Sequence, residues 1–271
     1  RRWQSVTLAT LTGLGLTLGT QTASEALNWQ DLFRGGIQVL QSVQLSHLSN
    51  KQEVDLGKQM NDNILSTQFK RYNNPTIQDY INRVGQRLVP RSQRSDLPYT
   101  FQVVESNEVN AFATMGGFVY VTTGLLKATS NEAELAGVLG HEMGHIEAKH
   151  LIKQISKTAL QQGILTAAGI SQSQVVQLGV ALAVSLPNSR EDERDADERG
   201  LRIMGDSGYA QSAMVSFMRK LETGKNPPQF LSTHPSPSNR VQDLERHIDP
   251  AKRNGMGLDE GAYRSQLVGL K

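Results

Sequence analysis

The chain has 271 residues, a formal net charge of +2 at pH 7, and 38% hydrophobic and 6% aromatic residues. This length is enough to bury one sizeable core, and it predicts one or two domains. The balanced charge offers no concentrated basic stripe, so we expect no nucleic-acid partner. The absence of cysteine excludes disulfides, thiolate metal sites and a cysteine nucleophile.

The first residues differ in character from the rest of the sequence. Arg1 and Arg2 precede an uncharged, mildly apolar run of about the length of a signal-peptide core. The run is too short and too rich in Thr and Gly for a comfortable membrane span. We therefore expect residues 1–26 to be a signal peptide or N-terminal leader of an exported, periplasmic or cell-envelope protein. An uncleaved leader that anchors the protein to a membrane is the alternative.

The N-terminal half of the remaining chain alternates helical and strand patterns. Apolar residues at helical spacing predict helices over residues 51–69 and 76–91. The segments Tyr99–Val104 and Phe118–Thr122 are typical of strands, the second after a Gly-Gly turn. A capping-box pattern that begins at Asn131 then predicts a helix running through Leu151.

The C-terminal half is predicted to be helical. It should contain two short buried helices within residues 164–186, a helix after Ser189, a helix over residues 211–221 and a proline-punctuated loop over residues 227–240. With no internal repeat and no clear linker, residues 27–271 are expected to form a single α+β domain.

The most informative stretch, residues 138–150, reads VLGHEMGHIEAKH. On a helix, His141 and His145 are about 40° apart round the axis, so both imidazoles point the same way. That spacing suits two nitrogens on one zinc ion. Glu142 lies at the edge of the same face, where it can take a proton from an attacking water without binding the metal. The pattern H-E-x-x-H therefore predicts half of a hydrolytic metal site.

A catalytic zinc needs a third protein ligand and one open position. The candidate segment is SREDERDAD, residues 189–197, although such an acidic run is also typical of an exposed helix face. Glu193 and Asp197 are four residues apart and share one face. One carboxylate could bind the metal while the second accepts the far N–H of a ligand histidine. The spacing alone does not choose Glu193 over Glu191 or Asp192.

His150 requires a separate interpretation. It lies nine residues after His141, which corresponds to about 180° round a continuous helix. It cannot join the same metal while that helix stays regular. We therefore interpret His150 as a packing or hydrogen-bonding residue.

Several segments in order resemble the family of zinc endopeptidases that includes the CAAX prenyl protease, the heat-shock protease HtpX and the periplasmic protease BepA. The resemblance extends from about Glu53 to Ile248. The segments that carry it are DLGKQM, YINRVGQRLV, NAFATMGGFVYVTTGLL, HEMGHIEAKH, SREDERDADERG and STHPSPSNR. The sequence contains neither the long spanning helices of the integral-membrane members nor the helical repeats of BepA, so we carry over only the peptidase module.

The resemblance implies a mostly helical, zincin-like metallopeptidase domain with a small sheet, whose edge strand flanks the active-site helix. It implies one Zn²⁺ per chain, held by His141, His145 and Glu193. It also implies that Asp197 is a helper carboxylate, and that the family's His-Pro and downstream Arg correspond to His234 and Arg240.

The resemblance further implies an endopeptidase that hydrolyses extended or misfolded envelope proteins in protein quality control. Its partners would be polypeptides, unfolded or membrane-associated, and peripheral membrane association is a further option. The strand around Asn110, Ala111, Phe112 and Ala113 is expected to offer an exposed edge to an extended peptide. An ordinary strand before a turn is the alternative interpretation of those residues.

Two points stay open from the sequence. His234 lies in a loop restricted by prolines, and it could occupy the open metal position as a latch or donate a hydrogen bond to the oxyanion, as could Arg240. A surface histidine is the third option. At the level of function, the alternative to an enzyme is a metal-stabilised chaperone-like or binding module. Such a module would have a closed four-ligand site and no need for Glu142.

Overall fold

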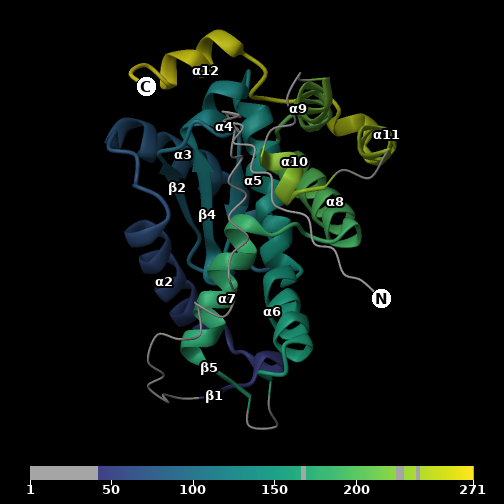
Figure 1. Ribbon diagram of the computed structural model, residues 1–271. Coiled ribbons are helices and arrows are strands. Elements are labelled where there is room, and N and C mark those ends of the chain that lie inside the picture. Colours follow the sequence, from purple (N-terminus) through teal and green to yellow (C-terminus); the bar gives the residue numbers. More distant parts are fainter. Residues whose placement is uncertain (1–41, 166–168, 224–228, 236–238, 271) are drawn as a thin grey trace, which may run out of the picture. The chain divides into compact units, whose positions relative to one another are not determined.

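The computed structural model describes residues 42–165, 169–223, 229–235 and 239–270 (Figure 1). The leader expected over residues 1–26 lies outside the described residues. The helices are α2 (Asn50–Thr67), α3 (Pro75–Leu88), α4 (Thr123–Ala128), α5 (Glu132–Glu147), α6 (His150–Gln161), α7 (Gln172–Ser185), α8 (Arg190–Asp206), α9 (Ser212–Thr223), α10 (Gln229–Thr233), α11 (Arg240–His247) and α12 (Glu260–Gln266).

The strands form a small mixed sheet. Strands β2 (Thr100–Val104), β3 (Ala111–Ala113) and β4 (Phe118–Thr122) are arranged in the order β2-β4-β3. Strand β2 runs parallel to β4, and β3 runs antiparallel to it, so β3 is an edge strand that contacts α5. Strands β1 (Ser42–Val43) and β5 (Ile170–Ser171) form a separate short antiparallel pair. These elements confirm the predicted α+β class, mostly helical with a small sheet.

Helices α5 and α8 form the centre of the fold, and they pack closely along each other (Figure 1). Every residue of α5 after Glu132 is buried. Glycines allow the close approach. A Cβ atom on Gly144 would lie 2.7 Å from the Ala196 carbonyl oxygen, and one on Gly200 would lie 2.9 Å from the backbone nitrogen of His141. The contact therefore brings the carboxylates of α8 directly beside the histidines of α5.

The helix predicted through Leu151 is two helices, so that prediction is wrong at its C-terminal end. Helix α5 ends at Glu147, and α6 begins at His150. Between them Lys149 adopts a left-handed conformation with φ 57°, which interrupts the helix without a glycine. The ammonium of Lys149 lies 3.5 Å from the Glu53 carboxylate of α2, so a tertiary contact accompanies the turn.

Two further expectations for the C-terminal half are corrected. The polar residues 171–174 start a helix and do not interrupt one: Ser171 and Gln174 form a capping box, and α7 then continues to Ser185. The loop expected over residues 227–240 contains the short helix α10, which buries Phe230 completely. Among the described residues, no helix has both the length and the apolar character that crossing a bilayer requires.

Candidate active site

Helix α5 presents two histidines toward one point. His141 and His145 are both buried, and their Nε2 atoms lie 3.1 Å apart. Both side chains project from the face of α5 that packs against α8, because a four-residue separation returns to nearly the same direction. The spacing that suggested a shared metal therefore produces convergent nitrogens.

Helix α8 contributes Glu193 to the same point. Its Oε1 lies 3.3 Å from His145 Nε2, and its Oε2 lies 3.4 Å from His141 Nε2. Glu191 is exposed, and Asp192 is directed toward His150, so neither alternative carboxylate reaches the two histidines. Burial alone would raise the pKa of the Glu193 carboxyl, but His234 and His141 hold it well below its ordinary value.

His234 adds a fourth donor from the segment after α10. Its Nδ1 lies 3.2 Å from His141 Nε2 and 3.1 Å from Glu193 Oε1. One donor atom each from His141, His145, Glu193 and His234 lies within 4.8 Å of the others. Imidazole nitrogens combined with a carboxylate oxygen are a typical donor set for zinc.

Two buried carboxylate oxygens support a cation at this point. Glu142 Oε1 and Glu193 Oε2 have no hydrogen-bond partner among the described residues. Glu193 Oε2 lies 3.2 Å from Arg240 Nη1 and 3.4 Å from His141 Nε2, which are ion-pair distances without hydrogen-bond geometry. Unsatisfied buried oxygens are costly in a native protein. The residues present therefore fit a divalent metal ion.

The second nitrogen of His141 is held by a charged pair. Its Nδ1 lies 2.9 Å from Asp197 Oδ1. Arg240 donates to both oxygens of Asp197, through Nε at 2.7 Å and Nη2 at 2.8 Å. Since ionised Asp197 accepts from Nδ1, Nε2 of His141 is the nitrogen left to face the metal position. Burial lowers the pKa of His141, but Glu193 and Asp197 outweigh it and raise it to about 9.

The second nitrogen of His145 is held differently. Its Nδ1 lies 2.9 Å from His150 Nδ1, and His150 Nε2 lies 3.3 Å from Asp192 and 3.2 Å from Asp195. Burial and the neighbouring His145 lower the pKa of His150 to about 4. The position expected for His150, half a turn away, is wrong because the helix ends before it. The turn at Lys149 folds His150 back onto His145.

His234 is not a surface residue, since only 2% of it is exposed. Its ring stacks on Phe230 at 4.4 Å, and its Nε2 lies 3.3 Å from the Ala111 carbonyl oxygen and 3.5 Å from Glu142 Oε1. Arg240 donates to the His234 carbonyl oxygen at 3.2 Å, besides its bonds to Asp197. We therefore interpret Arg240 as a residue that positions Asp197 and the His234 segment.

Strand β3 lies beside the donors but does not offer the exposed edge that was expected. Asn110, Ala111 and Phe112 are buried, and only Ala113 is partly exposed. Phe112 stacks on Tyr120 at 4.6 Å, and helix α7 contacts β3 from the other side. The edge is covered because the apolar α7 packs over it.

The cavity at the donors is small, with a volume of about 30 Å³. Its wall includes Phe112 of β3, Glu142 of α5, and Leu182 and Leu186 of α7. A cavity of this size admits about one or two water molecules. In this arrangement it has no room for a peptide.

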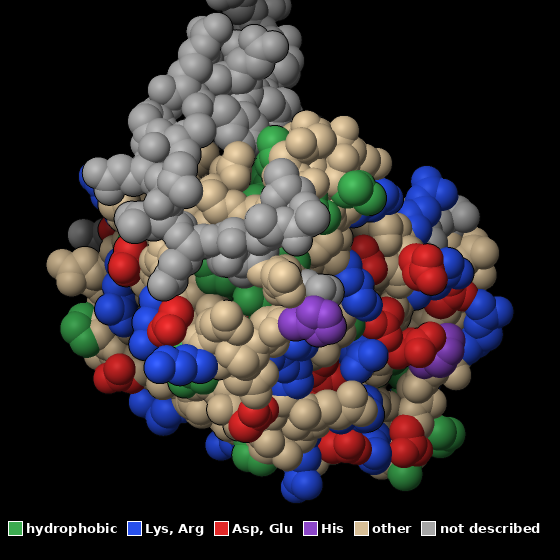
Figure 2. Space-filling model, turned by 90° about the horizontal axis from the view of Figure 1, so that it is seen from below, with side chains coloured by type: hydrophobic (Ala, Val, Ile, Leu, Met, Phe, Trp, Pro, Cys, Tyr) green, Lys and Arg blue, Asp and Glu red, His purple; other side chains and the backbone are tan. Residues whose placement is uncertain are grey.

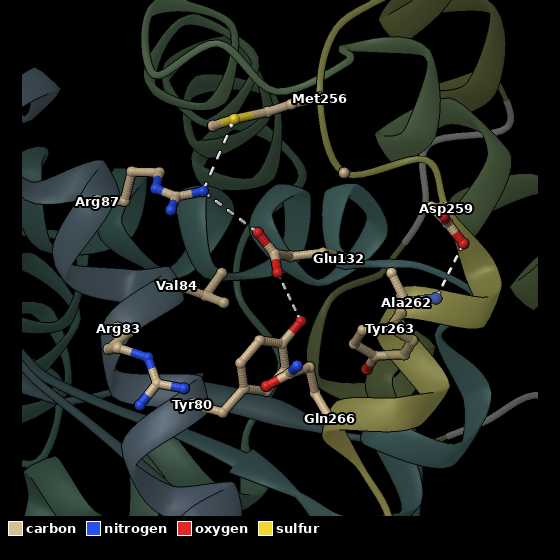
Figure 3. A pocket seen from close by; sticks show the side chains of 11 residues that line it. Tyr80, Arg83, Val84, Arg87, Glu132, Met256, Asp259, Ala262, Tyr263 and Gln266 are labelled. Atoms are coloured by element: carbon tan, nitrogen blue, oxygen red, sulfur yellow. Dashed lines mark hydrogen bonds and ion pairs between the residues drawn. The ribbon is translucent and has the colours of Figure 1, made fainter.

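A larger cavity of about 430 Å³ lies elsewhere, between α3, the start of α5 and α12 (Figure 3). Its Glu132 carboxylate accepts hydrogen bonds from Tyr80 at 2.7 Å and Tyr209 at 2.8 Å, and Arg87 lies 3.5 Å away. This carboxylate therefore already has two hydrogen bonds and an ion pair within the protein. We identify the candidate site with the convergent donors, despite the greater volume of this cavity.

Asn188 contacts Glu193 and was not predicted from the sequence. Asn188 Nδ2 donates to Glu193 Oε1 at 2.8 Å, and Asn188 Oδ1 accepts from Gln154 of α6 at 2.6 Å. Its backbone N–H also donates to the Thr233 carbonyl oxygen at 3.0 Å. An asparagine directly before the N-cap Ser189 looks like an ordinary turn residue, so no local pattern indicated this position.

On the face shown in Figure 2, basic and acidic side chains are interspersed among the coloured residues, without one continuous basic field. This agrees with the balanced net charge.

The chain is similar to several proteases. It is 30% identical over 217 residues to the beta-barrel assembly-enhancing protease of Escherichia coli strain K12, covering 73% of this chain and 45% of that protein. The putative beta-barrel assembly-enhancing protease of Vibrio cholerae is 29% identical over 215 residues, covering 72% and 44%. The mitochondrial metalloendopeptidase OMA1 of Schizosaccharomyces pombe is 31% identical over 180 residues, covering 64% and 53%.

The chain thus spans about half the length or less of these relatives. Residues 75–248 match peptidase family M48, and they contain all four convergent donors, Glu142, Asp197 and Arg240. The chain therefore belongs to peptidase family M48, through a family domain that covers residues 75–248.

Proposed function

We propose that this chain is a zinc-dependent endopeptidase. The observation that carries the proposal is the convergence of four buried donors beside Glu142, whose Oε1 has no hydrogen-bond partner among the described residues. A buried carboxylate without a structural partner destabilises a fold. Its presence next to a metal-binding cluster is explained if the carboxylate takes part in chemistry.

His141, His145 and Glu193 would hold the zinc ion. Bound zinc lowers the pKa of water toward neutrality and polarises a carbonyl oxygen. Asp197 keeps the proton of His141 on Nδ1, and the hydrogen bond from Asn188 occupies Glu193 Oε1. Oε2 of Glu193, which accepts no hydrogen bond among the described residues, would then be the oxygen available to the metal.

Glu142 would act as the general base and then as the general acid. It takes a proton from the attacking water while the water oxygen bonds to the carbonyl carbon of the substrate. It then delivers that proton to the leaving nitrogen as the C–N bond breaks. Burial of Glu142 favours this role because the carboxylate has little competing hydration.

His234 would be a latch in the arrangement described here. Its Nδ1 is as close to Glu193 Oε1, at 3.1 Å, as the two ligand histidines are to each other. A fourth protein donor would fill the position that substrate or water needs. His234→Ala should therefore raise basal proteolysis. If His234 instead donates to the oxyanion, the same variant should lose activity by about 10²–10³-fold.

The metal is tested by elemental analysis of protein purified without chelators, which should find about one zinc per chain. Glu193→Ala should lose most of the metal affinity, whereas the matched variant Glu191→Ala, at an exposed position of the same helix, should keep it. Equal losses in the two variants would show that the wrong carboxylate has been chosen. Casein digestion by the wild-type protein and by His234→Ala tests the hydrolytic activity.

A second candidate function is a metal-stabilised binding or chaperone-like module. The presence of four donors and a cavity of only about 30 Å³ favours it. That function predicts tight metal binding with no digestion of unfolded protein, even after His234→Ala. We favour the endopeptidase because the alternative leaves the buried Glu142 without a role.

We further propose an exported, cell-envelope location and extended or misfolded envelope proteins as substrates, with a role in protein quality control. The support is the similarity to relatives named beta-barrel assembly-enhancing protease. Fractionation of the native organism, with N-terminal sequencing of the recovered protein, should find it in the envelope with a start near Glu25 or Leu27. Recovery from the cytosol would contradict this location.

A further inference from the structure

A groove leads away from the metal donors along helix α6. It has a volume of about 410 Å³ and lies between α6 and the connection from α7 to α8. It shares Gln154, Leu182, Leu186 and Asn188 with the small cavity at the donors. The groove and the small cavity at the donors therefore share part of their wall.

The α6 side of the groove is cationic. Lys153 and Lys157, one turn apart, both line it, and both are exposed. Neither ammonium has an ion pair or hydrogen bond with another described residue. From residue 148 to residue 190 the sequence contains no Asp or Glu at all. Lys149, the preceding member of this i, i+4 series, differs because it lies 3.5 Å from Glu53.

The opposite side of the groove does not neutralise these lysines. Asp192 is the acidic residue that lines it, and its Oδ1 lies 3.3 Å from His150 Nε2. Asp195 pairs with Arg199 at 3.0 Å and with His150 at 3.2 Å. The remaining wall includes the apolar Leu182 and Leu186 of α7.

We propose that this groove receives an acidic side chain of the polypeptide substrate close to the scissile bond. Lys153 and Lys157 would then give the enzyme a preference for Asp or Glu over neutral and basic residues at that position. An acidic side chain fits because the groove provides two ammonium groups that have no ion pair with another described residue, while its apolar wall can contact the methylenes of the same side chain. This inference rests on the proposed endopeptidase function and names part of its specificity.

The expected effect is moderate because both lysines are exposed to solvent. Two exposed ion pairs together correspond to a preference of about 10-fold in kcat/KM for Glu over Gln. The preference should shrink as the salt concentration rises, because screening weakens pairs between exposed charges. A preference caused by shape alone would not depend on salt.

The test uses a set of peptides that share one cleavage sequence and carry Glu, Gln or Lys at each flanking position in turn. For the wild-type chain, kcat/KM should rank Glu above Gln above Lys at one position near the scissile bond. The double variant Lys153→Glu/Lys157→Glu should invert that ranking, and Lys153→Gln/Lys157→Gln should flatten it. Lys58→Glu, an exposed lysine on α2, is the matched control and should leave the ranking unchanged.

Binding of the same peptides to the Glu142→Gln variant, measured as Kd by fluorescence anisotropy, gives a readout that needs no turnover. Equal values for the Glu, Gln and Lys peptides, or a ranking that survives the double charge reversal, would overturn the inference. If the wild-type chain and His234→Ala cleave none of the peptides, the endopeptidase function is wrong. In that case the Kd series still decides whether the groove selects acidic peptides.

Discussion

The two histidines of α5 occupy equivalent positions in their motif but are supported by different neighbours. His141 is hydrogen-bonded to Asp197, which forms a buried ion pair with Arg240. His145 is within hydrogen-bond distance of His150. The carboxylates that contact His150, those of Asp192 and Asp195, lie closer to solvent, and the Asp195 side chain is 38% exposed. One side of the proposed metal site is therefore supported by a buried ion pair, and the other by a contact between two imidazoles.

The difference has an energetic consequence. Removing one partner of a buried ion pair leaves an uncompensated charge, which typically costs about 3–5 kcal/mol. The lowered pKa of His150, about 4, keeps that imidazole neutral at ordinary pH, so its loss leaves no buried charge. We therefore expect the His141 side to govern metal affinity and stability more strongly than the His145 side.

Glu142→Gln is the reference for this comparison, because it removes the proposed base and leaves the residues that support His141 and His145 unchanged. Zinc should stay bound at wild-type affinity, while hydrolysis of an unfolded substrate should fall by about 10²–10⁴-fold. Metal content and casein digestion measured on the same preparation check both halves. Digestion at the parental rate would remove Glu142 from the mechanism.

Asp197→Asn should be the most damaging change to the supporting residues. It removes the charge that orients His141 and leaves buried Arg240 without its main counterion, so metal affinity should fall by about 10–100-fold. The midpoint of urea unfolding should fall as well. Glu191→Gln, an exposed acid on the same helix, is the control for loss of one negative charge. If chelator competition found an unchanged metal affinity, the ion pair between Asp197 and Arg240 would not be needed for metal binding.

His150→Gln should have a smaller effect on the other side. The glutamine amide can still hydrogen-bond His145 Nδ1, so metal affinity should fall by about 10-fold or less. The unfolding midpoint should change little, since no charge is left unpaired. The comparison would be reversed if this variant lost more metal affinity than Asp197→Asn under the same conditions.

Asn188→Ala should give the smallest effect. The variant loses the 2.8 Å hydrogen bond to Glu193 Oε1, but water can take the place of the amide. Metal affinity should fall by about threefold. A Co²⁺-loaded sample adds a second measurement: its visible spectrum should change if Asn188 keeps Glu193 to one ligating oxygen. An identical spectrum and affinity would assign Asn188 to packing alone.

Much of the site follows from helical periodicity within single helices. His141 and His145 share a face of α5, and Glu193 and Asp197 share a face of α8, because each pair is four residues apart. The α+β class likewise followed from local apolar patterns, and the structure confirms it. What periodicity could not choose was the carboxylate, since Glu191, Asp192 and Glu193 lie within one turn and only packing against α5 separates them.

Other features depend on contacts between distant segments, and the sequence misled us there. No glycine or proline marks the helix break at Lys149, so the helical pattern appeared to continue and His150 was expected on the opposite side of the helix. The apolar residues of α7 predicted that this helix is buried, but not which surface it packs against. Strand β3 was therefore expected to have an exposed edge. No local pattern indicated Asn188, because its partners Gln154, Glu193 and Thr233 lie on three different helices, α6, α8 and α10.

The sequence by itself thus determined the residue types of the proposed site: the candidate donors, the candidate base Glu142, and the helical spacing that directs each pair to one side. Only the tertiary structure decided which carboxylate meets the histidines, which neighbour supports each histidine, and what covers the edge strand. The physical reason is that side-chain direction along a helix is a local property of the backbone. The meeting of two helices depends on packing between residues far apart in the chain, such as the glycine contacts between α5 and α8.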